Sequence, residues 1–260
     1  MRNPLNMPSE NGHKPGVHAR DTIDELARRL RPQLHPIDKQ FSWFPMLPVA
    51  EEDQRQYLQD PIESLPPAAI TLLPKIGVVL SPYLEKGAGR AATVVTETKP
   101  SEAKLALSAR VEGTGFVTMF FTVKGEQVAD YHYFFYDEIA ALISHRWPKK
   151  VADAWHGLLR EELSGEMHGE VDERSWRLKQ ALLRRPMNAR RDGKPFRDYA
   201  RQSFEDTMTL YLHGICCDID VDTGPRQLPS RCLRKRLELL KTLFPPPAGR
   251  GVFPEDVKSK

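Results

Sequence analysis

Cysteine is scarce in this sequence of 260 residues, which contains only Cys216, Cys217 and Cys232. Three cysteines cannot all pair with one another, and a disulfide between neighbours in the chain closes a strained ring. These observations exclude a framework stapled by disulfides and favour reduced thiols. We therefore expect an intracellular protein and assign it to the cytoplasm.

The sequence also lacks any apolar run of about 18 residues, the length that a membrane-spanning helix needs. Residues 1–20 are polar and contain no apolar core of a secretory signal. We expect a disordered tail there and no membrane contact. No internal repeat is present, so repeat architectures are excluded.

Composition is otherwise ordinary, with 40% hydrophobic and 28% charged residues and a net charge of +3. The length favours one domain. Proline is abundant between residues 36 and 82, where eight prolines surround the aromatic stretch FSWFPMLP. Because proline fixes φ and donates no hydrogen bond, this stretch predicts an extended arm packed on the domain, in cis or in trans.

Periodicity then divides the chain into a β part and a helical part. Short β-branched and aromatic segments over 75–124 predict a meander of three or four antiparallel strands. Spacings of three and four predict helices over 127–147, 149–185, 195–216 and 230–244. The expected fold class is α+β, a small antiparallel sheet followed by four helices, with a proline-rich N-terminal arm.

We expect one α+β domain over 21–244, between the tail over 1–20 and a loose tail over 245–260. Its parts are a helix and the arm over 21–74, the meander over 75–124 and the helical region over 127–244. The side-chain oxygen of Asp21 or Thr22 can cap the first helix.

Several catalytic templates are absent. His213 follows an apolar helical run but has no second histidine four residues later and no neighbouring glutamate, so a zinc-protease helix is excluded. No GxSxG nucleophile elbow occurs. Asp218, Asp220 and Asp222 resemble the start of a calcium loop, but the required glycine and glutamate are missing.

A thiolate–imidazole metal site is an alternative to simple packing of free thiols. His213 and Cys216 are three residues apart and share one side of a helix, and Cys232 could add a thiolate. Cys217 and His168 are further candidate ligands. The favoured interpretation has no cofactor, and the alternative has zinc or another divalent metal.

A metal-dependent hydrolase is the second hypothesis for function, and whether the protein is an enzyme stays open. Its site would lie between two long helices and combine His168, Glu205, His213 and Asp218 for acid–base and metal chemistry.

Charge segregation supports the first hypothesis, a binding or regulatory module. Residues 158–173 contain six acids and one arginine, net −5, whereas 183–201 and 226–241 each have a net charge of +5. The basic segments predict a surface for an acidic protein or for nucleic acid without sequence specificity. The predicted contact residues are Arg184, Arg185, Arg190, Arg191, Arg231, Arg234 and Lys235.

Overall fold

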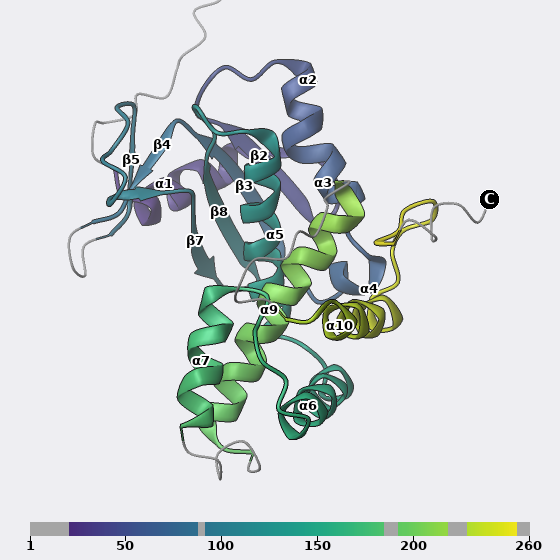
Figure 1. Ribbon diagram of the computed structural model, residues 1–260. Coiled ribbons are helices and arrows are strands. Elements are labelled where there is room, and N and C mark those ends of the chain that lie inside the picture. The colour runs from purple at the N-terminus through teal and green to yellow at the C-terminus, as the bar shows by residue number, and fades with distance from the viewer. Residues whose placement is uncertain (1–20, 88–91, 185–191, 218–227, 254–260) are drawn as a thin grey trace, which may run out of the picture.

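The fold is taken from a computed structural model that describes residues 21–87, 92–184, 192–217 and 228–253 (Figure 1). The predicted tail over 1–20, the three aspartates of the 218–222 segment, and Arg185, Arg190 and Arg191 lie outside these ranges. Among the described residues, no helix has both the length and the apolarity needed to cross a bilayer.

The β-structure forms two sheets, one of five strands and one of three. The strands of the larger sheet are β1 (His35–Pro36), β2 (Phe41–Pro45), β3 (Lys75–Ser81), β7 (Ser108–Gly113) and β8 (Phe116–Thr122). The strands of the smaller sheet are β4 (Tyr83–Glu85), β5 (Val94–Thr96) and β6 (Leu105–Ala106).

The larger sheet is mixed, with the order β1-β2-β3-β8-β7. Its three central strands run parallel, with Trp43 opposite Val78 and Val78 opposite Met119. The two edge strands pair antiparallel with their neighbours. Parallel neighbours need a long crossover, and the helices between β2 and β3 and the small sheet between β3 and β8 supply these connections.

The helical elements are α1 (Ile23–Leu30), η1 (Arg31–Gln33), α2 (Glu51–Gln54), η2 (Arg55–Gln59), α3 (Asp60–Glu63), α4 (Pro67–Ile70), α5 (Val128–Ser144), α6 (Lys149–Ser164), α7 (Glu173–Leu183), α9 (Lys194–Cys216) and α10 (Ser230–Leu243). Helix α9 packs against α5, α6, α7 and α10, so it organises the helical half of the molecule (Figure 1).

Alternate residues of the strands point to opposite faces of the larger sheet, and both faces are covered by other elements. On one face Val78, Leu80 and Met119 join the main core with α5 and α9. On the other face Val79 and Phe120 pack with α1 and the small sheet. The C-terminal helices therefore lie on one face of the sheet, and α1 with the small sheet lies on the other.

The α+β class is confirmed, but the predicted sheet was too small and of the wrong kind. The near-continuous apolar runs KIGVVL and FVTMFF are typical of strands buried on both faces, as the central strands of a parallel sheet are. The proline-rich arm also contributes regular structure in cis. Its FSWFP segment is strand β2, which ends at Pro45, and Pro61 and Pro67 lie in the first turns of α3 and α4.

The single long helix predicted over 149–185 is two helices, α6 and α7. Gly165 caps α6, and Glu166 and Gly169 then adopt positive φ values of 52° and 82°, which end a right-handed helix. The helix predicted over 195–216 is confirmed as α9, and the first helix begins at its predicted cap, Thr22.

Candidate metal centre

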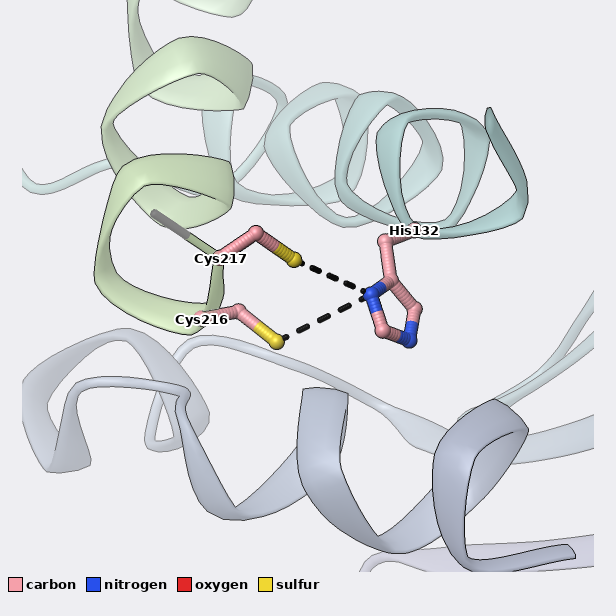
Figure 2. A group of neighbouring side chains, drawn as sticks. All are labelled: His132, Cys216 and Cys217. Atoms are coloured by element: carbon pink, nitrogen blue, oxygen red, sulfur yellow. Dashed lines mark hydrogen bonds between the residues drawn. The ribbon is translucent and has the colours of Figure 1, made fainter. Parts of the chain in front are cut away.

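The C-terminal end of α9 and the first turns of α5 bring three metal-ligating side chains together. His132, Cys216 and Cys217 each place one donor atom within 4.8 Å of the other two donor atoms. Figure 2 shows both sulfur atoms directed at the same ring nitrogen of His132. In the described part of the chain, this is the one cluster of three or more His, Cys, Asp or Glu side chains with that geometry.

Two adjacent cysteines reach the same point because α9 ends between them. Cys216 is the last helical residue, whereas Cys217 is the cap, with an extended backbone at φ −121° and ψ 140°. Adjacent side chains on a continuous helix diverge by about 100°. The break in conformation at Cys217 allows both thiols to face α5.

The backbone carbonyl of Gln56 fixes the orientation of His132. The imidazole Nε2 lies 2.7 Å from that oxygen, so Nε2 donates its proton to the carbonyl and Nδ1 faces the two thiols. Nδ1 lies 3.2 Å from Sγ of Cys217 and 3.9 Å from Sγ of Cys216. A carbonyl that holds the second ring nitrogen is the usual support for a histidine metal ligand.

The Gln56 carbonyl is free to accept this bond because of Pro61. Gln56 lies in the π-helical turn η2, where the amide of Asp60 donates to the carbonyl of Arg55, five residues earlier. The next bond of that pattern would run from residue 61 to Gln56, but proline has no N–H. His132 supplies the missing donor.

The measured separations suit a common metal ion. With zinc–sulfur bonds of about 2.3 Å and zinc–nitrogen bonds of about 2.0 Å, a tetrahedral ion sets sulfur and nitrogen ligands about 3.5 Å apart. The two nitrogen–sulfur distances, 3.2 and 3.9 Å, lie on either side of that value. Shifts of a few tenths of an ångström would bring both sulfur atoms to that distance from Nδ1.

The environment favours a thiolate at Cys216. A hydrogen bond from Cys217 lowers the pKa of the Cys216 thiol, and His132, Tyr136 and Ser64 lower it further against the opposing effect of burial. The same thiol–thiol bond, together with burial, raises the pKa of Cys217. Burial lowers the pKa of His132, but its bonds to Cys216 and Gln56 outweigh burial and raise that pKa.

The sequence-predicted metal ligands are only partly brought together. Cys216 belongs to the cluster, but His213 and Cys232 do not. His213 is buried beside Tyr133 and Tyr136, and its Nε2 has no hydrogen-bond partner among the described residues. Cys232 is buried in the main apolar core, so it behaves as a small hydrophobic side chain.

The residues of the hydrolase hypothesis also do not meet in one ligand set. His168 is exposed in the connection between α6 and α7, because the predicted long helix is broken there. Glu205 accepts a hydrogen bond from the Ser144 hydroxyl at 2.5 Å. His213 is buried as described, and Asp218 lies outside the described residues.

The predicted basic surface is partly neutralised within the chain. Lys235 pairs with Glu161 at 2.6 Å and Arg234 with Glu238 at 3.0 Å, both at exposed positions. Arg231 is exposed on the same helix and lies 3.7 Å from the Met167 sulfur.

Arg184 lines a shallow hollow on α7 together with Trp176 and Leu183. Contacts within the chain do not test whether an anionic partner binds. Binding of an anionic partner therefore stays a prediction.

His132 is the residue of the cluster that sequence reasoning missed. His132 lies 84 residues before Cys216, so no local spacing connects them. The pattern of its segment, YHYFFY, is also compatible with a strand. Pro61 removes a backbone donor from the helix that His132 contacts, but only the tertiary structure connects the two residues. Comparison with known proteins gives no match, since no family model, no curated protein and no solved structure is significantly similar to this chain.

Proposed function

We propose that this protein binds one thiophilic metal ion, zinc or copper(I), through Nδ1 of His132 and the sulfur atoms of Cys216 and Cys217. The observation that carries the proposal is the convergence of the three donor atoms within 4.8 Å. Thiolate and imidazole donors suit both ions. Such an ion would link the start of α5 to the end of α9.

Burial and access both support this proposal. His132 is 6% exposed, and such a polar ring needs partners, which Gln56 and the thiols provide. Cys216 and Cys217 are only partly buried, so an ion can reach them from solvent.

The test is a zinc titration of the reduced protein in competition with a chromophoric chelator. We expect one ion per chain and an affinity at least about tenfold weaker after His132→Ala, Cys216→Ala or Cys217→Ala. Cys232→Ala is the matched control, because this third cysteine lies in the apolar core away from the cluster. Equal binding by all variants would refute the proposed ligands, and no binding by the unmodified protein would refute the function.

A thermal unfolding experiment supplies a second readout. An ion present at about 100 times its dissociation constant stabilises the folded state by about 2.7 kcal/mol. We expect zinc to raise the unfolding midpoint of the unmodified protein and of Cys232→Ala, and to leave that of Cys216→Ala unchanged.

A further inference from the structure

The backbone at the end of α9 turns two adjacent cysteine side chains to the same side. Cys216 is the last helical residue, and Cys217 has φ −121° and ψ 140°, so an extended residue follows a helical one. This order of conformations is that of a type VIII turn. The two sulfur atoms lie within 4.8 Å of each other, and both are directed at Nδ1 of His132 (Figure 2). Rotation of the two side chains about their Cα–Cβ bonds is the movement that would bring the sulfur atoms together.

A disulfide between these two neighbours would be strained and therefore easily reduced. Consecutive Cα atoms lie about 3.8 Å apart across a trans peptide bond, whereas the Cα atoms of most disulfides lie about 4.4–6.8 Å apart. Strain of this kind makes the sulfur–sulfur bond more reducible. Labile disulfides are the ones that serve regulatory roles, so a bridge here would act as a reversible modification and not as a structural staple.

The adjacent pair differs from the third cysteine in its access to a small oxidant. Cys216 and Cys217 are only partly buried, whereas Cys232 is buried among apolar side chains of the main core. Cys232 also does not belong to the cluster of donor atoms. A thiol that is accessible and has a second thiol beside it is the usual arrangement for reversible oxidation. The structure therefore separates the pair from the third cysteine as a modification site.

Metal binding and disulfide formation exclude each other at this site. The proposed ion uses both sulfur atoms as thiolate ligands, and a disulfide retains no thiolate. With zinc–sulfur bonds of about 2.3 Å, a tetrahedral ion holds its two sulfur atoms about 3.8 Å apart. A disulfide needs a separation of about 2.05 Å, so a bound ion keeps the two sulfur atoms from reacting with each other.

We infer that Cys216 and Cys217 form a reversible dithiol–disulfide pair whose oxidation by a peroxide releases the metal ion. In the first step the thiolate of one cysteine attacks a peroxide oxygen, and the oxygen–oxygen bond breaks to give a sulfenic acid and hydroxide. In the second step the other thiol attacks the sulfenic sulfur, and its proton leaves with the hydroxyl group as water. The two sulfur atoms together lose two electrons, and the peroxide gains them. The release of metal rests on the proposed function and adds its regulation.

The first experiment treats the reduced, metal-free protein with one equivalent of hydrogen peroxide and measures the intact mass. Cys232→Ala keeps only the adjacent pair, and Cys217→Ala keeps Cys216 and Cys232 as its matched control. We expect Cys232→Ala to remain monomeric, to lose two hydrogen atoms and both free thiols, and to recover both thiols with dithiothreitol. Cys217→Ala should form no internal bridge, because Cys232 lies in the apolar core.

The second experiment measures zinc affinity before oxidation, after it and after reduction. We expect oxidised Cys232→Ala to bind zinc at least about a hundredfold more weakly than its reduced form, and dithiothreitol to restore the affinity. Bound zinc should slow bridge formation at least about tenfold in Cys232→Ala. The double variant His132→Ala with Cys232→Ala keeps both thiols but lacks the imidazole ligand. Its bridge should form, and the same zinc concentration should protect it less.

Two results would overturn the inference while leaving the proposed function intact. One is oxidation of Cys232→Ala to a sulfinic acid or to a disulfide-linked dimer without an internal bridge. The other is a bridge that dithiothreitol does not reduce. Unchanged zinc affinity after the bridge has formed would overturn both the inference and the proposed ligands. If zinc does not bind to the reduced, unmodified protein, metal release fails with the proposed function, and the mass measurement decides the dithiol–disulfide pair separately.

Discussion

The guanidinium of Arg236 lies 2.7 Å from a carboxylate oxygen of Glu170, and neither side chain is exposed to solvent. Arg236 also binds Glu162 at 2.6 Å, and Lys179 lies 3.3 Å from Glu170. This buried ionic cluster joins α6, α7 and α10 to the connection that carries Glu170. It also explains part of the charge segregation, since acidic and basic segments neutralise each other in the interior.

Removing the arginine should therefore destabilise the protein strongly. Arg236→Met leaves two buried carboxylates without their main partner, which costs about 3–5 kcal/mol of unfolding free energy. Lys235→Met is the matched control, because the adjacent Lys235 pairs with Glu161 at an exposed position. We expect the control to unfold at nearly the same urea concentration as the unmodified protein, because an exposed ion pair adds little to stability. Equal effects of the two variants would contradict a buried cluster.

Acid should weaken this cluster in a defined pH range. Burial opposes ionisation of Glu170, but Arg236, Lys179 and Tyr199 outweigh it and lower the pKa of this carboxyl from 4.5 to about 2. A lowered folded-state pKa stabilises the fold above the unfolded-state pKa, and the gain is lost as pH falls from about 4.5 to about 2.

Unfolding free energies measured across that pH range should show the loss. We expect the unmodified protein to lose about 3 kcal/mol more than Glu170→Gln, in which the position cannot titrate. Identical pH profiles for the two proteins would contradict the assignment.

Gly77 in the central strand β3 is required by close packing. A Cβ atom there would lie 2.7 Å from Leu34 Cδ1 and 3.1 Å from Phe116 Cζ. Gly77→Ala should cost about 1–3 kcal/mol of stability, because the neighbours must shift.

Gly157 in α6 is the matched control, because an added Cβ would meet nothing within 4 Å. Gly157→Ala should stabilise the helix by about 0.5–1 kcal/mol. Chemical denaturation of both variants tests the expected opposite signs, and destabilisation by Gly157→Ala would count against the described packing of α6.

The basic surface predicted from the sequence has its own test on heparin. If the exposed face of α10 contacts polyanions, Arg231→Gln should elute at lower salt than the unmodified protein. Lys149→Gln, an exposed lysine on α6 outside the basic segments, is the control and should elute unchanged. Lack of retention at low salt would remove the anionic-partner hypothesis.

Local signals predicted much of the helical half of the fold. Thr22 caps α1 as expected, α9 spans its predicted range, and the proline after Trp147 separates α5 from α6. These features depend on short spacings and on caps, which sequence reasoning reads directly. The predicted antiparallel direction of the central strands was wrong, because the parallel pairing of β2 with β3 joins segments separated by about 30 residues.

The sequence predicted only part of the candidate metal centre. The paired cysteines at the end of an apolar helix were recognised as candidate ligands, but their histidine comes from α5 through tertiary packing. His213 has the right spacing from Cys216 on α9, yet it is buried between aromatic rings of Tyr133 and Tyr136. Spacing along one helix therefore indicated an imidazole that lies outside the cluster of three donor atoms.

Metal content measured by mass spectrometry tests the central claim most directly. The protein would be purified under reducing conditions without a histidine tag or chelator, beside His132→Ala and His213→Ala. We predict about one zinc or copper ion per chain in the unmodified protein and in His213→Ala, and none in His132→Ala. No metal in the unmodified protein, or loss in His213→Ala with retention in His132→Ala, would contradict the proposed centre.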